Sequence, residues 1–403
     1  MTNRTAVLVL FGVALLPGVG RAAPKPPTLC AGVTACSAAA ETTGTAAGST
    51  GTAAPSTQGI KYHPGHYAAL DGMLRASNRS TLMAEHMRQI EELANEPNIV
   101  GVQLYVQWSA LEGDTPGDYA AGIQMLKSYL AALAPIKKRL MVALIHVQFG
   151  GYPPSDLSQF FPSYIWKNPS GQYGATAMRN GITARVWQQA TMDRVIDQVQ
   201  AYGKQFDSDP YFEMVALGET SVATDAGVDG FSQENLLAQF KRLYTASRAV
   251  WPNTSIRLTA NYVGSDAQTV DLIKFCAALK CAVGGPDVIP SEDIQANRVF
   301  SGGGGGTDYR GILPFVAEVQ SPELGGHEGT WTPAQLYDHS IKGNASVGIN
   351  GTHPQYFVWL RNTWSGGAAQ QWSTGILPFV QSIKGAVAST ACPSAYTSGC
   401  RSQ

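Results

Sequence analysis

Apolar, β-rich runs alternate with stretches of helical periodicity from Ile60 to Ala388, and this alternation constrains the fold more than any other feature of the chain. It is typical of βαβ units and a parallel sheet. The predicted strands are Tyr67–Asp71, Ile99–Gln107, Leu140–Gln148, Phe212–Gly218, Ile256–Asn261, a short run near Ala282, Leu313–Val319 and Tyr356–Leu360. Eight such units in about 330 residues match a single-domain (β/α)8 TIM barrel of the α/β class.

The stretches between these strands carry apolar residues at three- and four-residue spacing, which predicts helices. They are Thr81–Asn95, Val186–Phe206, Leu236–Val250, Thr269–Leu279 and Gly375–Val387. Two helix starts have the pattern of a capping box, Ser265 with Gln268 and Thr332 with Gln335.

A doubly wound open sheet is the competing fold. Such a sheet usually has a glycine-rich turn after its first strand, whereas here Asp71, Gly72 and Met73 follow. A later glycine run, Gly302–Gly306, lacks the Lys-Ser/Thr pair that completes a phosphate-binding loop. We therefore favour the barrel and interpret the glycine run as a mobile loop.

The N-terminus has the pattern of an export signal. Arg4 precedes an apolar run, Ala6 to Leu16, and small residues follow near Gly20 and Ala22. This run is too short to span a bilayer, which needs about 20 residues. We predict a signal peptide over 1–22, a secreted or periplasmic protein, and no membrane contact after cleavage.

The rest of the chain divides by composition. Residues 23–59 are rich in Ala, Ser, Thr and Gly, which predicts a disordered linker. We assign residues 60–390 to the barrel and residues 391–403 to a tail. The six cysteines form three close pairs, Cys30 with Cys36, Cys276 with Cys281, and Cys392 with Cys400. Three local disulfides are expected in an oxidising compartment, the last of them within the tail.

Charge and composition exclude several classes of ligand. With 28 Lys+Arg against 29 Asp+Glu, the chain has no basic excess for nucleic acid. Charged residues make up 14%, and the chain has 8 Trp and 16 Tyr, a composition suited to uncharged polar ligands. The sequence has no zinc-binding spacing of His and Cys, so we expect neither a metal nor another cofactor.

Two glutamates close predicted strands. Glu219 follows Phe212–Gly218 at the end of the fourth strand, and Glu318 lies near the end of the seventh. In a TIM barrel the active site forms at the C-terminal ends of the strands. A carboxyl group beside a buried run is costly unless it is paired, so the alternative role of each is a rim ion pair. Two facing carboxyl groups are what glycoside hydrolysis requires.

This arrangement resembles the large clan of retaining (β/α)8 glycoside hydrolases that includes cellulases, mannanases and β-galactosidases. The resemblance implies that Glu219 is the acid/base and that Glu318 is the nucleophile. The segment from Trp108 through Glu112 to Tyr119 is similar to the second-strand region of the clan. This similarity implies that Trp108 binds substrate.

Two further positions are similar to the clan. His146 closes the third strand like a substrate-binding histidine, and core packing is its alternative role. Trp359 on the eighth strand resembles the aromatic residue beneath the sugar that is cleaved, and barrel core is its alternative role. The long loop over 149–183 is expected to form one wall of a cleft and to set chain-length specificity.

One position departs from the clan, because Gly218 stands where most members have an Asn before the acid/base. We expect Asn261 or Gln148 to supply the missing amide, and Tyr262 or His146 to steady the nucleophile. Glu323 is the substitute nucleophile if the seventh strand ends later than predicted.

We therefore predict a monomeric, secreted enzyme that cleaves β-linked polysaccharide or oligosaccharide of the glucan or mannan type with retention. The alternatives are a transglycosylase and a non-catalytic carbohydrate-binding barrel. An esterase is disfavoured because the sequence has no GxSxG motif.

Overall fold

The computed structural model describes residues 59–149, 157–167, 171–178, 181–222, 224–261, 263–320, 323–325, 330–363 and 366–402. The predicted signal peptide, the linker up to residue 58, and the pair Cys30 and Cys36 lie outside these residues.

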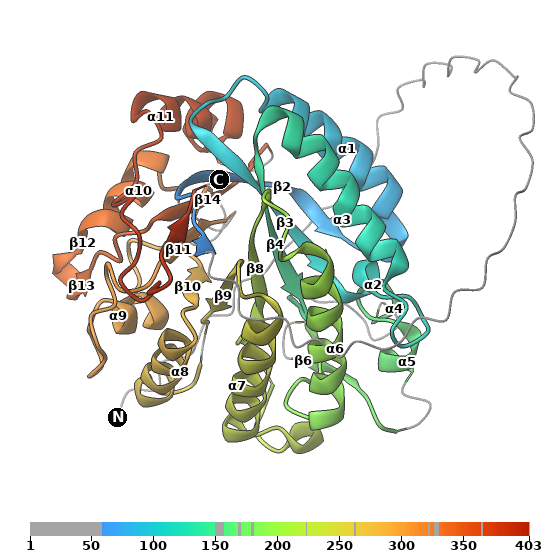
Figure 1. Ribbon diagram of the computed structural model, residues 1–403. Coiled ribbons are helices and arrows are strands. Elements are labelled where there is room, and N and C mark those ends of the chain that lie inside the picture. Colours follow the sequence, from blue (N-terminus) through green and yellow to red (C-terminus); the bar gives the residue numbers. More distant parts are fainter. Residues whose placement is uncertain are drawn as a thin grey trace, which may run out of the picture. The chain divides into compact units, whose positions relative to one another are not determined.

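Eight parallel strands close into a barrel, which confirms the predicted TIM fold (Figure 1). In chain order they are β2 (Gly65–Leu74), β3 (Ile99–Gln107), β4 (Arg139–Ile145), β8 (Phe212–Glu219), β9 (Ser255–Thr259), β10 (Ala282–Pro286), β11 (Phe315–Val319) and β14 (Tyr356–Leu360). Strand β14 pairs with β2 and completes the ring. Each predicted strand overlaps one of these, including the short run near Ala282, which is β10.

Helices surround the barrel (Figure 1). They are α1 (Arg79–Glu92), α2 (Trp108–Leu111), α3 (Ala120–Leu133), α4 (Leu157–Phe160), α5 (Ser163–Trp166), α6 (Gln189–Phe206), α7 (Gln233–Val250), α8 (Asp266–Ala278), α9 (Gln295–Phe300), α10 (Pro333–Lys342) and α11 (Leu377–Ser382). Both predicted capping boxes form, at the starts of α8 and α10. The last predicted helix is shorter than expected, because Lys384 and Gly385 take positive φ angles of 52° and 66° and end it.

Short strands lie outside the barrel. The third βα loop contains a three-stranded antiparallel sheet of β5 (Val147–Phe149), β7 (Gly181–Ala184) and β6 (Ala175–Met178). Strands β12 (Gly343–Asn344) and β13 (Ile349–Asn350) form a small hairpin. Strand β1 (Ile60–Lys61) pairs with β15 (Cys400–Arg401) and joins the two ends of the described chain.

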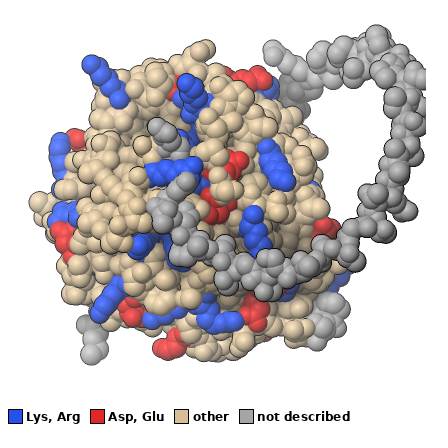
Figure 2. Space-filling model, viewed as in Figure 1, with Lys and Arg blue, Asp and Glu red and all other residues tan. Residues whose placement is uncertain are grey.

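Side chains alternate between two apolar layers, as in other small barrels. Val102, Leu104 and Val106 belong to the layer between strands and helices. The inner layer is smaller and includes Tyr67, Met141, Met214, Val316 and Tyr356. Basic and acidic side chains are interspersed on the face shown in Figure 2, as the balanced charge predicts.

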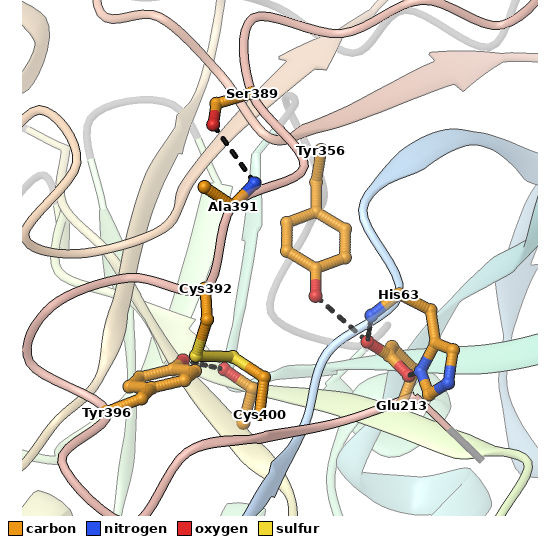
Figure 3. Close-up of a disulfide and its surroundings, with 9 residues drawn as sticks. His63, Glu213, Tyr356, Ser389, Ala391, Cys392, Tyr396 and Cys400 are labelled. Carbon is orange, nitrogen blue, oxygen red and sulfur yellow. Dashed lines mark hydrogen bonds and ion pairs between the residues drawn. A yellow bond between two sulfur atoms is a disulfide. The ribbon is translucent and has the colours of Figure 1, made fainter.

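The cysteines follow the prediction in one of the two pairs that the structure describes. Cys392 and Cys400 form the expected disulfide in the tail (Figure 3). Cys276 and Cys281 are free thiols, so the prediction of a disulfide there is wrong. Both are completely buried at the end of α8 and pack as small apolar side chains.

Candidate active site

A β-bulge presents Glu219 at the C-terminal end of the barrel. On β8, Ala216 pairs with Arg257 and Glu219 pairs with Thr259, so three steps along β8 oppose two along β9. Gly218 lies in the bulge with φ at 84°, a conformation that favours glycine. A Cβ atom there would stand 2.8 Å from His146 Nδ1. The glycine that departs from the clan is thus required by the bulge and by His146.

Glu219 is half-buried and has one hydrogen-bond donor among the described residues, the side-chain amide of Asn261. Thr220 holds Asn261 in place, because its hydroxyl accepts from the Asn261 backbone N–H and donates to the Asn261 carbonyl, both at 2.7 Å. Of the two residues predicted to supply the missing amide, Asn261 is thus the one bonded to Glu219.

The pKa of Glu219 is raised to about 7. Burial is the largest cause, and the negative charge of Glu318 adds to it, whereas the Asn261 amide and the Arg257 charge act in the opposite direction. A carboxyl group with this pKa carries a proton during much of its time near neutral pH, as a general acid must.

Glu318 lies inside the barrel and is held by three side chains. Its Oε1 accepts hydrogen bonds from Gln103 Nε2 at 2.7 Å and from the Tyr105 hydroxyl. Its Oε2 accepts from Arg257 Nη2 at 2.8 Å, and both members of this ion pair are 2% exposed. Arg257 also donates to Gln103 Oε1 at 3.1 Å. All three side chains donate to the carboxyl group, which is the arrangement that an anion needs.

The structure thus brings the two predicted glutamates together. They close the fourth and seventh strands of one closed barrel. The charge of Glu318 raises the pKa of Glu219, and Arg257 acts on the same carboxyl group. One group able to hold a proton and one fixed carboxylate therefore share a single barrel mouth.

The two predicted substrate-binding tryptophans are completely buried, so both predictions are wrong. Trp359 packs between the barrel and its helices, where its indole donates to His66 Nδ1 at 2.8 Å and its ring stacks on Phe357. On β14 the side chains alternate, so Tyr356 and Val358 belong to the inner layer, whereas Phe357 and Trp359 belong to the outer one.

The indole of Trp108 donates to Glu112 Oε2 at 2.7 Å. Glu112 Oε1 accepts from the Gly117 backbone N–H at 2.7 Å and from Arg194 Nη2 at 2.6 Å. The clan-like segment Trp108 to Tyr119 thereby anchors the second βα loop to α6. Its role in this chain is structural.

His146 lies behind Glu219 and is 6% exposed. Its ring contacts the Trp108 ring edge-on at 5.4 Å. Burial lowers its pKa to about 4, so the ring is neutral. Among the described residues Glu318 is bonded to Gln103, Tyr105 and Arg257, so His146 does not steady it. Tyr262, the other candidate, lies outside the described residues.

The two remaining candidates, Gln148 and Glu323, have other hydrogen-bond partners. Gln148 accepts from Gln107 at 2.8 Å and donates to the Phe149 carbonyl at 2.7 Å. Glu323, the substitute nucleophile, accepts from the backbone N–H groups of Val288 at 2.7 Å and Gln320 at 3.0 Å. It is completely buried, and it joins the loops that follow β10 and β11.

Gln103, Tyr105 and Arg257 were not predicted as site residues from the sequence. A signal for them exists, because Gly101, Gln103 and Tyr105 alternate with apolar residues along Ile99–Gln107. Polar residues at alternate positions of a barrel strand face the interior. Arg257 stands likewise between Ile256 and Leu258.

In the part of the chain that the structure describes, no group of three or more His, Cys, Asp or Glu could hold a metal ion. Within the same residues, no helix has both the length and the apolar character needed to cross a membrane.

Comparisons with known proteins connect the chain to solved structures. Neither a protein-family model nor a curated protein sequence matches it. A variant of GH5_18 from Streptomyces cattleya in complex with Manb1-4GlcNAc has a TM-score of 0.53 at 8% identity, over 80% of each chain. GH5_18 in complex with GlcNAc has a TM-score of 0.51 at 10% identity, over 81% of this chain and 80% of that one. A beta-glucanase from Saccharophagus degradans has a TM-score of 0.45 at 12% identity, over 81% and 89%. The first two likenesses support the barrel fold.

Proposed function

We propose that this chain is a secreted glycoside hydrolase that cleaves β-linked glycan of the glucan or mannan type with retention. The observation that carries the proposal is the pairing of Glu219, whose pKa is about 7, with Glu318, whose carboxylate is held by Gln103, Tyr105 and Arg257. The fold neighbours crystallised with GlcNAc and Manb1-4GlcNAc support a sugar substrate.

In the first step, Glu318 attacks the anomeric carbon while Glu219 donates its proton to the glycosidic oxygen. The bond from the anomeric carbon to that oxygen breaks, the leaving sugar departs as an alcohol, and a glycosyl ester forms on Glu318. In the second step, Glu219 takes a proton from water, the water oxygen attacks the anomeric carbon, and the ester bond to Glu318 breaks.

The electrostatics of the site suit this exchange of roles. The charge of Glu318 is one of the causes that raise the pKa of Glu219. Esterification removes that charge, so the pKa of Glu219 falls and the group becomes a base when the second step requires one. Arg257, which is bonded to Glu318, is placed to stay near both carboxyl groups during the cycle.

The test replaces each glutamate with alanine and assays soluble β-glucans, mannans and xylans. We expect both Glu219→Ala and Glu318→Ala to lose activity by about 100-fold or more. On a 2,4-dinitrophenyl β-glycoside, whose phenolate leaves without a proton, azide should rescue Glu219→Ala with formation of a β-glycosyl azide, and Glu318→Ala with formation of an α-glycosyl azide, as read by NMR. Glu234→Ala, an exposed residue of α7, is the control.

Wild-type rates in both glutamate variants would contradict the proposal. A sugar that binds but is not cleaved by wild type would favour the carbohydrate-binding alternative, and products longer than the substrate would favour a transglycosylase. The N-terminal sequence of exported protein tests cleavage after residue 22, and light scattering tests the predicted monomer.

A further inference from the structure

Two loops beside Glu219 are joined through Asp229. One loop contains β5, β6 and β7 and ends at Gln188, before α6. The other follows Glu219 and ends at Ser232, before α7. Both leave the C-terminal ends of neighbouring barrel strands, β4 and β8.

Asp229 uses its side chain and its backbone in this junction. Its Oδ2 accepts from the Thr176 hydroxyl and from Arg185 Nη2, the latter at 3.0 Å. Its backbone carbonyl accepts from Trp187 Nε1 at 3.0 Å and from Gln188 Nε2 at 2.9 Å. All four donors belong to the first loop, so one residue of the second loop accepts four hydrogen bonds from the first.

The backbone of Asp229 is unusual for a residue with a side chain. Its φ and ψ angles are 48° and 34°, in the left-handed region. Outside glycine, Asn and Asp tolerate this region best. Two rings pack behind the junction, because Trp187 meets Phe231 edge-on with centroids 5.3 Å apart. The junction therefore fixes both the hydrogen bonds and the path of the second loop.

The inner ends of the same two loops meet at Glu219. A cavity of about 10 Å³, the space of one water molecule, is lined by Thr183 and Val186 from the first loop, Val222 from the second, and Glu219 itself. A shift of either loop would therefore move the surroundings of Glu219 as well as the rim.

We infer that Asp229 is a positioning residue that fixes the two loops to each other, so that together they form the wall that contacts the leaving-group part of the glycan. The inference rests on the proposed function. Glu219 protonates the glycosidic oxygen, and that oxygen departs with the leaving sugar. The loops that flank Glu219 therefore border the leaving sugar, whereas the loops after β10 and β11 flank Glu318 and the sugar that it attacks.

The test compares substrates that differ in their leaving group. Cellotetraose and mannotetraose leave with a sugar, which must contact this wall. The 2,4-dinitrophenyl β-cellobioside and β-mannobioside leave with a phenolate that needs neither sugar contacts nor a strong acid. The variants are Asp229→Ala and Arg185→Ala. The control is Asp271→Ala, which breaks the Lys241–Asp271 ion pair (2.5 Å) between α7 and α8.

We expect Asp229→Ala and Arg185→Ala to lower kcat/KM for the tetrasaccharide about tenfold, with less than about twofold change for the aryl glycoside. Asp271→Ala should change neither. Equal losses on both substrates, or no loss on either, would overturn the inference while leaving the proposed function intact. A wild-type protein that turns over none of the four substrates would contradict the proposed function, and the inference would fall with it.

Discussion

Strand β8 carries a glutamate near each end, and the two differ in the number of hydrogen-bond donors around them. At the N-terminal end Glu213 is completely buried and accepts three hydrogen bonds (Figure 3). They come from the backbone N–H of His63 at 2.8 Å, His63 Nδ1 at 2.7 Å and the Tyr356 hydroxyl at 2.9 Å. At the C-terminal end the described partner of Glu219 is the Asn261 amide alone.

The pKa values follow from this difference. For Glu213, burial acts to raise the pKa, but the hydrogen bonds and charge of His63, with the charge of Arg139, outweigh it, and the pKa is lowered. For Glu219, burial outweighs the Asn261 amide and the Arg257 charge, and the pKa rises to about 7. Burial acts to raise the pKa of both carboxyl groups, so the hydrogen bonds and charges around each one decide the direction of its shift.

The N-terminal end of the barrel is stabilised by further contacts. Lys61 is buried and donates to the backbone carbonyls of Asp207 at 3.1 Å and Asp209 at 2.7 Å. Burial lowers its pKa to about 8. The Cys392–Cys400 disulfide lies near Tyr396, whose hydroxyl bonds with Ser255 at 2.9 Å (Figure 3). These contacts stabilise the N-terminal end of the barrel, whereas the C-terminal end carries the two glutamates of the proposed active site.

The largest expected effect comes from a substitution of Glu219, at the C-terminal end of the barrel. Glu219→Gln should lower kcat for an oligosaccharide by about 1,000-fold, because the amide cannot deliver a proton. The free energy of unfolding at pH 8 should stay level or rise, since burial disfavours the ionised carboxyl group that the amide replaces. Steady-state rates and chemical denaturation measure the two quantities. A large loss of stability would contradict the contrast drawn between the two ends.

The reverse pattern is expected for Glu213→Gln. The free energy of unfolding should fall by about 3 kcal/mol, because a buried, fully bonded carboxylate loses its charge, while kcat per folded molecule stays within about twofold. The pKa of Glu213 is lower in the folded protein, so its stabilisation is complete above about pH 5 and is lost as the pH falls. Urea unfolding from pH 4 to pH 8 should show the gap between wild type and variant closing at the acidic end.

Tyr356→Phe is the matched control at this position. It removes one neutral donor from Glu213 and should cost about 1 kcal/mol. A cost equal to that of Glu213→Gln would mean that the Tyr356 hydroxyl, and not the charge of the carboxylate, accounts for the stabilisation at this position.

The disulfide should have the next effect. Replacing Cys392 and Cys400 together with Ser opens a loop with a sequence separation of 8, which should lower the free energy of unfolding by about 2 to 3 kcal/mol. Activity should not change, since the tail lies at the opposite end of the barrel from Glu219. Loss of activity in protein that remains folded would contradict this separation of roles.

The smallest expected effect is a shift in the pH dependence of kcat/KM, which tests the proposal that Glu219 is the acid. Activity that needs its proton should fall as the pH rises above about 7. The Asn261 amide lowers the pKa of Glu219, so Asn261→Ala should move this basic limb of kcat/KM to higher pH by a fraction of a unit. A shift to lower pH, or none, would show that another group controls the limb.

Patterns within short stretches of the sequence were sufficient to predict the architecture. The eight strands, the capping boxes at Ser265 and Thr332 and the two strand-end glutamates could all be predicted, because each depends on residues within one turn or one strand of each other. The proximity of these two glutamates followed because parallel strands of a barrel bring their C-terminal ends to one mouth.

Contacts across the barrel could not be predicted from such patterns. Which face Trp359 presents depends on the register of β14, and a step of one residue exchanges inside and outside. The partners of Glu318 come from strands β3 and β9, 215 and 61 residues away at Gln103 and Arg257. Trp108 was misread for a similar reason, since its ring contacts His146 and Phe161, which lie far from it along the chain.

The order of residues along the chain was thus enough to establish a closed eight-stranded barrel with two acidic groups at its mouth. The protonation of Glu219 was settled by folding, because a pKa depends on the charges and donors within a few ångströms. Glu213 and Glu219 differ by six positions on one strand, yet the hydrogen bonds and charge of His63 lower the pKa of the first, whereas burial and the charge of Glu318 raise the pKa of the second.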